Sequence, residues 1–194
     1  QTRGRVARGN TLAGRRPRAA MDWSVAAALA REARAHDERR VLVLAGGTES
    51  TTDPLAAAER ALDAADVSLS SSTLVGPESG MACEQLEAHQ ASQLLGTTRS
   101  AVVLDCRRAC RPNTLGTVVG AVDGGGLLVL VTPPLDAWPD RRDGFDETLA
   151  VPPDTLADVS GHFRHRLVQT LQAHPGIAIV DLDAGTVSRD GLTH

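Results

Sequence analysis

The feature that most constrains the fold is an uninterrupted apolar run, LLVLVT at residues 127–132, which two prolines follow. Successive side chains of a strand point to opposite faces of a sheet, so a run that is apolar at every position must be covered on both sides. Pro133 and Pro134 end the run, because proline has no N–H to donate to a neighbouring strand. The run therefore predicts a central strand of a covered parallel sheet.

A helix is predicted immediately before this strand. Pro112 has the backbone torsion angle of a first helical turn. The apolar side chains that follow recur at the spacing of one helical face: Leu115, Val118, Val119 and Val122. Helix, turn and strand thus form one unit of an α/β fold.

Glycines lie within this helix and at its exit. Gly116 and Gly120 lie four residues apart, and each costs about 1 kcal/mol of helix propensity relative to alanine. We therefore expect another backbone to approach the helix closely there. Gly124 is predicted to take the left-handed C-cap conformation, with Gly125 and Gly126 forming the turn.

Apolar runs alternate with helical patterns along the whole chain. Strands are predicted at 41–47, 67–76, 100–106 and 177–183, and helices at 22–40, 52–66, 81–96 and 157–176. The helix at 52–66 begins with Thr52 or Asp53 as N-cap and Pro54 as its first residue. Residues 135–155 are predicted to be loop, and no element is predicted after residue 183. The alternation predicts an α/β fold: a three-layer Rossmann-like domain with a mainly parallel sheet.

Composition excludes several classes of protein. No run of 18 or more apolar residues is present, so no membrane span is predicted. Three cysteines, an odd number, disfavour a disulfide framework and favour a reducing cytoplasm. Aromatic residues make up only 2% of the chain, too few for a protein that reads single-stranded bases by stacking.

The charges are unevenly placed, and every basic residue is an arginine. Residues 1–20 hold six arginines and no acidic residue, which predicts a disordered basic arm. This arm is either of non-native origin, such as an over-extended gene start, or a segment that touches RNA. The remainder has 14 arginines against 24 acidic residues, which suggests a high-salt cytoplasm or a GC-rich genome. That balance argues against strong nucleic-acid binding by the body at low salt.

A glycine turn, LAGGTESTTD at 44–53, lies between a predicted strand and a predicted helix, where phosphate-binding loops are found. It lacks the GK[ST] ending, and the chain has no lysine, so a P-loop nucleotide site is excluded. A weaker anion-binding turn stays open as an alternative to a plain connection.

The remaining polar candidates favour structural roles. Cys83, Cys106 and Cys110 have loose spacing and no nearby histidine, so unrelated small cysteines are favoured over a metal site or a thiol nucleophile. His162 and His165, three residues apart on a predicted helix beside Arg164 and Arg166, are interpreted as solvated.

An arginine cluster follows the predicted strand 100–106. Arg107, Arg108 and Arg111 lie at the carboxyl end of a strand, where α/β domains bind ligands. They are candidates for contact with RNA phosphate or with an acidic patch of a neighbouring domain. Asp105, at the same strand end, is interpreted as a turn or cap residue.

The chain resembles the N-terminal domain of the tRNA(Met) cytidine acetyltransferase (TmcA) family of bacteria and archaea. The similarity covers residues 40–183 and is strongest over 100–183. The features that carry it are a strand ending in Asp105, Pro112-Asn113, Leu115-Gly116, Gly120, Gly125-Gly126, the LLVLVTPP strand, Trp138 and His174-Pro175-Gly176.

This resemblance implies a longer protein that acetylates N4 of a tRNA cytidine with acetyl-CoA and hydrolyses ATP with Mg²⁺. Such proteins add a helicase-like ATPase module, a GNAT acetyltransferase module and an RNA-binding tail. Here GK[ST] and the acetyl-CoA motif Q/R-x-x-G-x-G/A are both missing, so no catalytic, cofactor-binding or metal residue carries over. The resemblance implies a non-catalytic scaffold that packs against the ATPase module and frames an RNA channel.

The expected organisation has three parts. Residues 1–20 form the arm, residues 21–184 form the α/β domain, and residues 185–194 form a tail or linker toward a missing ATPase module. On this interpretation the chain is a cytoplasmic, archaeal fragment whose partners are the other modules and tRNA. The alternative is a free-standing Rossmann-like protein that binds a nucleotide or another small ligand, and enzymatic activity of the chain alone stays open.

Overall fold

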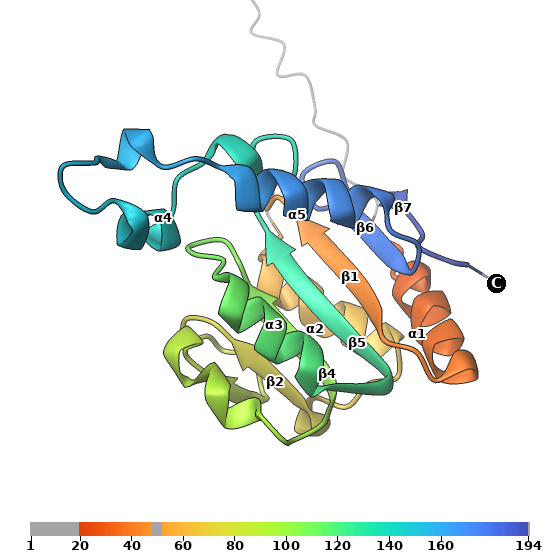
Figure 1. The fold of residues 1–194 in the computed structure, drawn as a ribbon. Helices are drawn as coiled ribbons and strands as arrows, with labels where there is room; N and C mark the ends of the chain where they lie inside the picture. Colours follow the sequence, from red (N-terminus) through yellow and green to blue (C-terminus); the bar gives the residue numbers. More distant parts are fainter. Residues whose placement is uncertain (1–19, 48–51, 194) are drawn as a thin grey trace, which may run out of the picture.

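The computed structural model describes residues 20–47 and 52–193. In this part of the chain a sheet is covered by helices on both faces (Figure 1). Its strands are β1 (Arg40–Ala45), β2 (Ser72–Val75), β3 (Glu84–Leu86), β4 (Arg99–Asp105), β5 (Val122–Thr132), β6 (Ile177–Asp181) and β7 (Thr186–Arg189). The α-helices are α1 (Ser24–His36), α2 (Pro54–Ala64), α3 (Pro112–Ala121), α4 (Gly144–Leu149) and α5 (His162–Ala173). Short 3₁₀ helices are η1 (Leu69–Ser71), η2 (Ala88–Leu94), η3 (Trp138–Asp140) and η4 (Leu156–Asp158).

The sheet is parallel except at one edge. Its strand order is β3-β2-β4-β5-β1-β6-β7, and only β7 runs antiparallel to its neighbour. In the centre, Leu42 of β1 lies between Val129 of β5 and Ala178 of β6. The apolar run 127–132 is buried throughout, as its pattern predicts. The predicted three-layer α/β fold with a mainly parallel sheet is confirmed.

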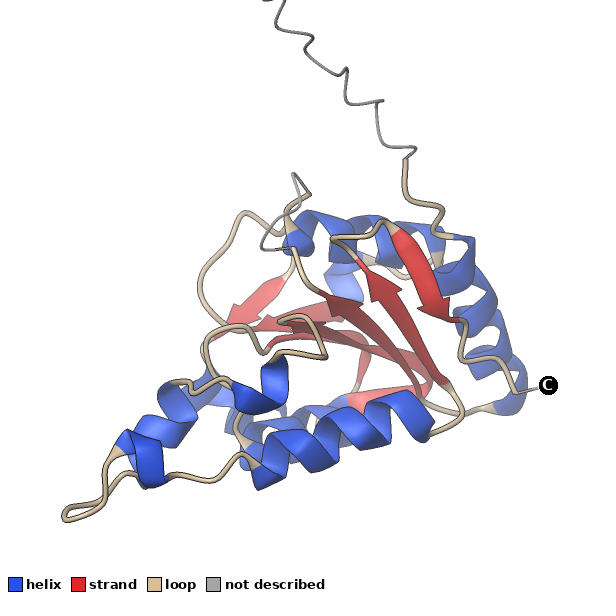
Figure 2. Ribbon diagram, turned by 90° about the horizontal axis from the view of Figure 1, so that it is seen from above, coloured by secondary structure: helices blue, strands red, loops and turns tan. Residues whose placement is uncertain are grey.

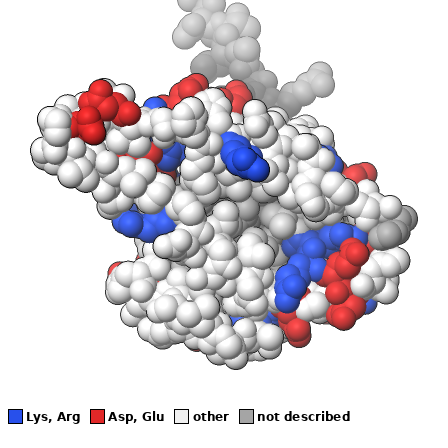
Figure 3. All heavy atoms as spheres, viewed as in Figure 1, with Lys and Arg blue, Asp and Glu red and all other residues white. Residues whose placement is uncertain are grey.

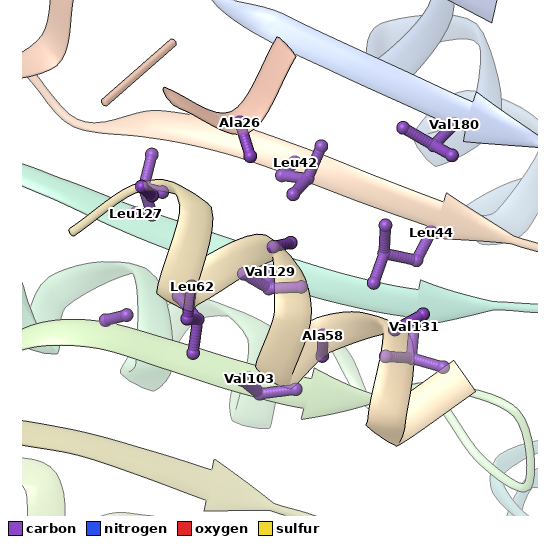
Figure 4. Close-up of a cluster of buried hydrophobic side chains, with 14 of the residues drawn as sticks. Ala26, Leu42, Leu44, Ala58, Leu62, Val103, Leu127, Val129, Val131 and Val180 are labelled. Carbon is purple, nitrogen blue, oxygen red and sulfur yellow. The ribbon is translucent and has the colours of Figure 1, made fainter. Parts of the chain in front are cut away.

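Helices lie on both faces of the sheet (Figure 2), and an apolar layer lies between the sheet and the helices on each face. Helices α1 and α2 cover one face, where Leu62 of α2 packs with Val103 and Val129 (Figure 4). Helices α3 and α5 cover the other face, with Val118 and Val168 among the buried side chains. The layer under α1 and α2 consists of Leu, Val and Ala apart from Met81, so small residues allow these helices to pack close to the strands. The other layer also contains two cysteines, two isoleucines and a tryptophan: Cys106, Cys110, Ile177, Ile179 and Trp138.

The glycine turn differs from the sequence prediction. Strand β5 begins at Val122, directly after α3, and Gly125 rather than Gly124 has a positive φ, +76°. The Gly125 N–H donates to the Glu38 carbonyl at 3.0 Å, so the turn packs on the α1–β1 connection. A Cβ on Gly124 would collide with the Asp37 carboxylate, so any other residue there would require this side chain to move.

The prediction for Gly116 and Gly120 is wrong. Both positions are exposed, and no atom lies within 4 Å of where their Cβ atoms would be. The apolar stripe of α3 is also narrower than predicted, because Val119 is 44% exposed. The helix covers the sheet with Val118 and Ala121 instead.

The helix predicted at 81–96 is also wrong. Its place is taken by edge strand β3 and by η2. The Gln85 side chain binds the Ser79 N–H and the Met81 carbonyl, at 2.9 and 2.8 Å, which holds the backbone in an extended path beside β2. Gly96 still ends the element, with φ of +74°.

Two further segments contain elements that were not predicted. Residues 135–155 contain η3 and α4, and Asp143 caps α4 by accepting from the Phe145 and Asp146 N–H groups. Residues 185–194, expected as a tail or linker, contain β7, and Thr193 binds Glu32 of α1 through its N–H at 2.8 Å.

Other predictions are confirmed or lie beyond the described residues. Asp53 is the N-cap of α2 and Pro54 its first residue, as predicted. Residues 1–19 of the predicted arm lie outside the described part of the chain. Within the described residues, no helix combines the length and apolar character that crossing a bilayer requires.

Candidate functional site

The turn after β1 occupies the position where α/β folds bind phosphate, at the carboxyl edge of the sheet. Gly46 and Gly47 have φ of +96° and +86° there. The Gly47 N–H donates to Asp183 Oδ1 at 3.1 Å, and a Cβ on Gly46 would collide with the same carboxylate. A negative side chain from the end of β6 therefore lies where a phosphate oxygen would be expected.

The N-terminus of α2 follows this turn, and a carboxylate caps it as well. Asp53 accepts from the N–H groups of Leu55 and Ala56, at 3.4 and 3.2 Å. These N–H groups are the donors that a helix terminus offers to an anion. Asp183 and Asp53 thus use the N–H groups of Gly47, Leu55 and Ala56, and the Gly46 N–H donates to the Thr132 carbonyl at 3.0 Å. Residues 48–51 lie outside the description. Because the chain has no lysine, the described residues of this turn do not fit a nucleoside triphosphate.

The predicted arginine cluster divides into one paired and two unpaired side chains. Arg107 forms a two-point ion pair with Asp105, with N–O distances of 2.9 and 2.7 Å. These hydrogen bonds raise the pKa of the Arg107 guanidinium, and the carboxylates of Asp105 and Asp53 add to the effect. Asp105 also accepts from the Arg107 N–H at 3.0 Å, which confirms it as a turn residue. Arg107 is therefore already neutralised within the domain.

Arg108 and Arg111 are exposed and line a pocket of about 760 Å³ at the carboxyl ends of β2 and β4. Neither side chain has a hydrogen bond or ion pair to any residue of the described part. Thr114, in the first turn of α3, belongs to the same wall. Basic side chains are visible beside the N-terminal part of α3, below the projecting α4 segment (Figure 3).

The opposite rim of this pocket is acidic. Glu78, Glu87 and His89 contribute to it. Glu87 lies 3.2 Å from His89 Nδ1, which partly balances its charge when the ring is protonated. The pocket thus presents a basic wall on α3 and an acidic wall on the β2–η2 side.

Two of the three cysteines meet, which the sequence did not predict. Cys106 and Cys110 are buried and share a hydrogen bond, whereas Cys83 lies elsewhere, against the core on the α2 side. That hydrogen bond, with burial and the nearby Asp105 and Asp143 carboxylates, raises the pKa of the Cys106 thiol well above its ordinary value. A thiol held in this way is not a nucleophile. Among the described residues, no group of three or more Cys, His, Asp or Glu side chains is arranged to hold a metal.

The predicted polar face of α5 contains a buried cation. His162 and His165 are exposed, as interpreted from the sequence. Arg164 between them is only 2% exposed and binds Asp146 of α4 at 2.7 Å and Asp143 at 3.5 Å. No local pattern marks Arg164 for burial, but the Asp143-x-x-Asp146 spacing is a helix-start signal that could have located α4.

A second pocket, of about 530 Å³, lies at the carboxyl ends of β1 and β6. Its lining includes Leu135 and Ile179 together with Asp136, Asp181 and Asp183. Arg189 also lines this pocket, but its guanidinium donates to the Gln172 and Ala173 carbonyls, and the three carboxylates outnumber it, so the lining disfavours a phosphate group.

A protein-family model and several curated proteins match most of the chain. A family model described as "tRNA(Met) cytidine acetyltransferase TmcA, N-terminal" matches residues 20–182. Proteins named tRNA(Met) cytidine acetyltransferase TmcA from Haloarcula marismortui and Haloferax volcanii are 56% and 55% identical over 87% of this chain. A protein of the same name from Nitrosococcus halophilus is 34% identical over 81% of the chain.

The matched region is a small part of those relatives. It represents 21%, 22% and 20% of their respective lengths, so the chain spans about one fifth of the curated relatives it matches. Because the family model covers residues 20–182, the chain belongs to the family of tRNA(Met) cytidine acetyltransferase TmcA N-terminal domains.

Proposed function

We propose that this chain is the non-catalytic N-terminal scaffold of an ATP-dependent tRNA(Met) cytidine N4-acetyltransferase. The relatives' names, together with the one-fifth share of their length, support a role as one domain of a larger tRNA-modifying enzyme. In this proposal, other modules of the enzyme bind acetyl-CoA, ATP and Mg²⁺. In this proposal the domain begins at residue 21 and includes β7, which pairs with β6, and the Thr193 contact with Glu32, so the ATPase module is a separate part of the enzyme.

The observation that carries this proposal is the blocked β1–α2 turn. Asp183 accepts from the Gly47 N–H, and Asp53 accepts from the first N–H groups of α2. A phosphate would have to displace two carboxylates and would meet their negative charge, with no lysine to compensate. An α/β domain whose phosphate position is closed in this way retains its layers for packing rather than for nucleotide chemistry.

The partners in this proposal are the ATPase and GNAT modules of the same polypeptide and the tRNA that they modify. Of the candidate contacts, Arg108 and Arg111 remain available on the surface, whereas Arg107 is paired with Asp105. We place the enzyme in the cytoplasm, where its tRNA substrate is found.

A chimera tests the scaffold role. The N-terminal region of the Haloferax volcanii relative is replaced by this chain, to which it is 55% identical, and compared with a deletion of that region. We expect the chimera to acetylate tRNA and the deletion variant to lose most of its activity, whereas the 194-residue chain alone neither hydrolyses ATP nor acetylates RNA. Catalysis by the isolated chain, or full activity of the deletion variant, would reject the proposal.

The alternative of a free-standing ligand-binding protein depends on the pocket of about 530 Å³, whose size suits a small molecule. Its carboxylates favour an amine-bearing ligand over a nucleotide. Thermal-shift measurements with nucleotides, CoA and polyamines discriminate between the two: a shift of several degrees favours the alternative, and no shift favours the scaffold.

A further inference from the structure

The pocket beside α3 combines several features that suit an anion. Arg111 is the N-cap of α3 but makes no side-chain hydrogen bond to the first turn. The first hydrogen bond of the helix runs from the Leu115 N–H to the Arg111 carbonyl at 3.0 Å. The N–H groups of Asn113 and Thr114 come before it and therefore have no acceptor within the helix. This helix terminus therefore keeps its donors and its positive end of the dipole available.

A side-chain hydroxyl on the first turn of α3 adds a further polar group to the same wall. Thr114 is only 8% exposed and lines the pocket. Its hydroxyl group has no hydrogen-bond partner among the described residues. This hydroxyl is therefore available to a molecule in the pocket as a donor or an acceptor.

Arg108 and Arg111 add two full charges at the same wall, and both lack partners in the described chain. The Asp105 carboxylate, also in this pocket, is taken up by Arg107 at 2.7 Å. The acidic residues left are Glu78 and Glu87, on the other rim. A ligand that fits must offer negative charge on the α3 side and hydrogen-bond donors on the other.

We propose that this pocket binds one nucleotide of single-stranded RNA, with its phosphate held by Arg108, Arg111 and the first turn of α3. A nucleotide provides the phosphate for the basic wall, and ribose hydroxyl and base N–H donors for Glu78 and Glu87. The volume, about 760 Å³, is sufficient for a nucleotide. The choice of RNA rests on the proposed function, whereas the anion site rests on the residues alone.

Binding by the 194-residue chain tests the proposal directly. Inorganic phosphate should shift the NMR amide signals of Asn113 and Thr114, and a short unstructured RNA should shift them at lower concentration. In fluorescence anisotropy, Arg108→Gln/Arg111→Gln should weaken RNA binding about tenfold or more, because charge-assisted hydrogen bonds are lost. Thr114→Val should weaken it less, and Arg166→Gln, an exposed arginine on α5, should leave it unchanged.

Three results would overturn the proposal. The first is the absence of amide shifts at Asn113 and Thr114 with both phosphate and RNA. The second is RNA affinity that is equal in the double arginine variant and in Arg166→Gln. The third is binding of matching DNA as tight as that of RNA, which would reject the choice of RNA, or equally tight binding of a polyglutamate peptide, which would reject the nucleotide assignment.

The outcomes separate this site from the scaffold role. If the double arginine variant loses RNA binding but the enzyme that lacks this domain keeps full activity, the RNA site is supported and the proposed scaffold function is rejected. Unchanged RNA binding, combined with activity that requires the domain, would reject the site and keep the scaffold.

Discussion

Replacing Arg164 with methionine should destabilise the domain far more than replacing any exposed arginine. The Arg164 side chain is 2% exposed, and it binds the Asp146 carboxylate, which is 3% exposed, at 2.7 Å. Asp143 is 3.5 Å from the same guanidinium and accepts from the Cys110 N–H at 3.3 Å. The network therefore ties α5 to α4 and to the β4–α3 connection, and it anchors the projecting α4–η4 segment (Figure 1).

The expected loss in free energy of unfolding is about 3–5 kcal/mol at pH 7, because methionine leaves Asp146 as a buried charge without its cation. Burial raises the pKa of Asp146, but in the native protein the bonds from Arg164 and Asp143 outweigh this and lower it overall. The stabilisation from this carboxylate is therefore present above its unfolded pKa of about 4 and is lost as the pH falls through the lower folded value. In Arg164→Met only the Asp143 hydrogen bond still opposes the effect of burial on Asp146. Protonation of Asp146 therefore costs less in the variant, and the difference in stability from wild type shrinks toward pH 4.

Urea denaturation of the 194-residue chain at several pH values measures this loss, with Arg166→Met as the matched control on the same helix. Adding Asp146→Asn to Arg164→Met should recover part of the stability, since the uncompensated charge is removed. Limited proteolysis should cut the single variant faster within residues 147–160. A loss below about 1 kcal/mol, as expected for an exposed pair, or an equal loss at pH 4 and pH 7, would refute the reasoning.

Four further substitutions test other parts of the structure, the glycine variants by the same denaturation assay and the Glu32 variant by amide hydrogen exchange. Gly116→Ala and Gly120→Ala should each stabilise the protein by about 0.5–1 kcal/mol, because both are exposed helix positions with free space. Destabilisation would instead indicate that another backbone lies close to α3, as the sequence predicted. Gly191→Ala should destabilise by about 2 kcal/mol or more, because φ is +70° and the new Cβ would meet the Ile177 backbone, whereas Gly80→Ala, in open space, should be neutral. Glu32→Gln should speed amide exchange at residues 190–193, because Glu32 binds both Arg40 and the Thr193 N–H at 2.8 Å; unchanged exchange would mean that the C-terminal segment is held without this contact.

Local sequence patterns were sufficient to predict the three layers and most of the helices and strands. The run at 127–132 required cover on both faces, and Asp53-Pro54 marked the start of α2, since both signals depend only on neighbouring residues. The helix predicted at 81–96 failed because the Gln85 side chain binds a loop and β3 pairs with β2, neither of which a helical pattern can reveal.

The candidate sites depended more strongly on contacts between distant segments. The sequence located Arg107, Arg108 and Arg111 together, but only the structure separated the first, paired with Asp105, from the two that line the pocket. The pairing of Cys106 with Cys110 likewise follows from the path of the loop between them.

The sequence by itself determined the α/β layering and the absence of a lysine-based phosphate loop, because periodicity and residue type are properties of each segment alone. Only the tertiary structure decided that Asp183 closes the Gly47 turn and that Arg164 is buried against Asp146. Those contacts join residues 136 and 18 positions apart. Whether a charge is paired, buried or available depends on what the fold brings beside it, and that is set by packing of the whole domain.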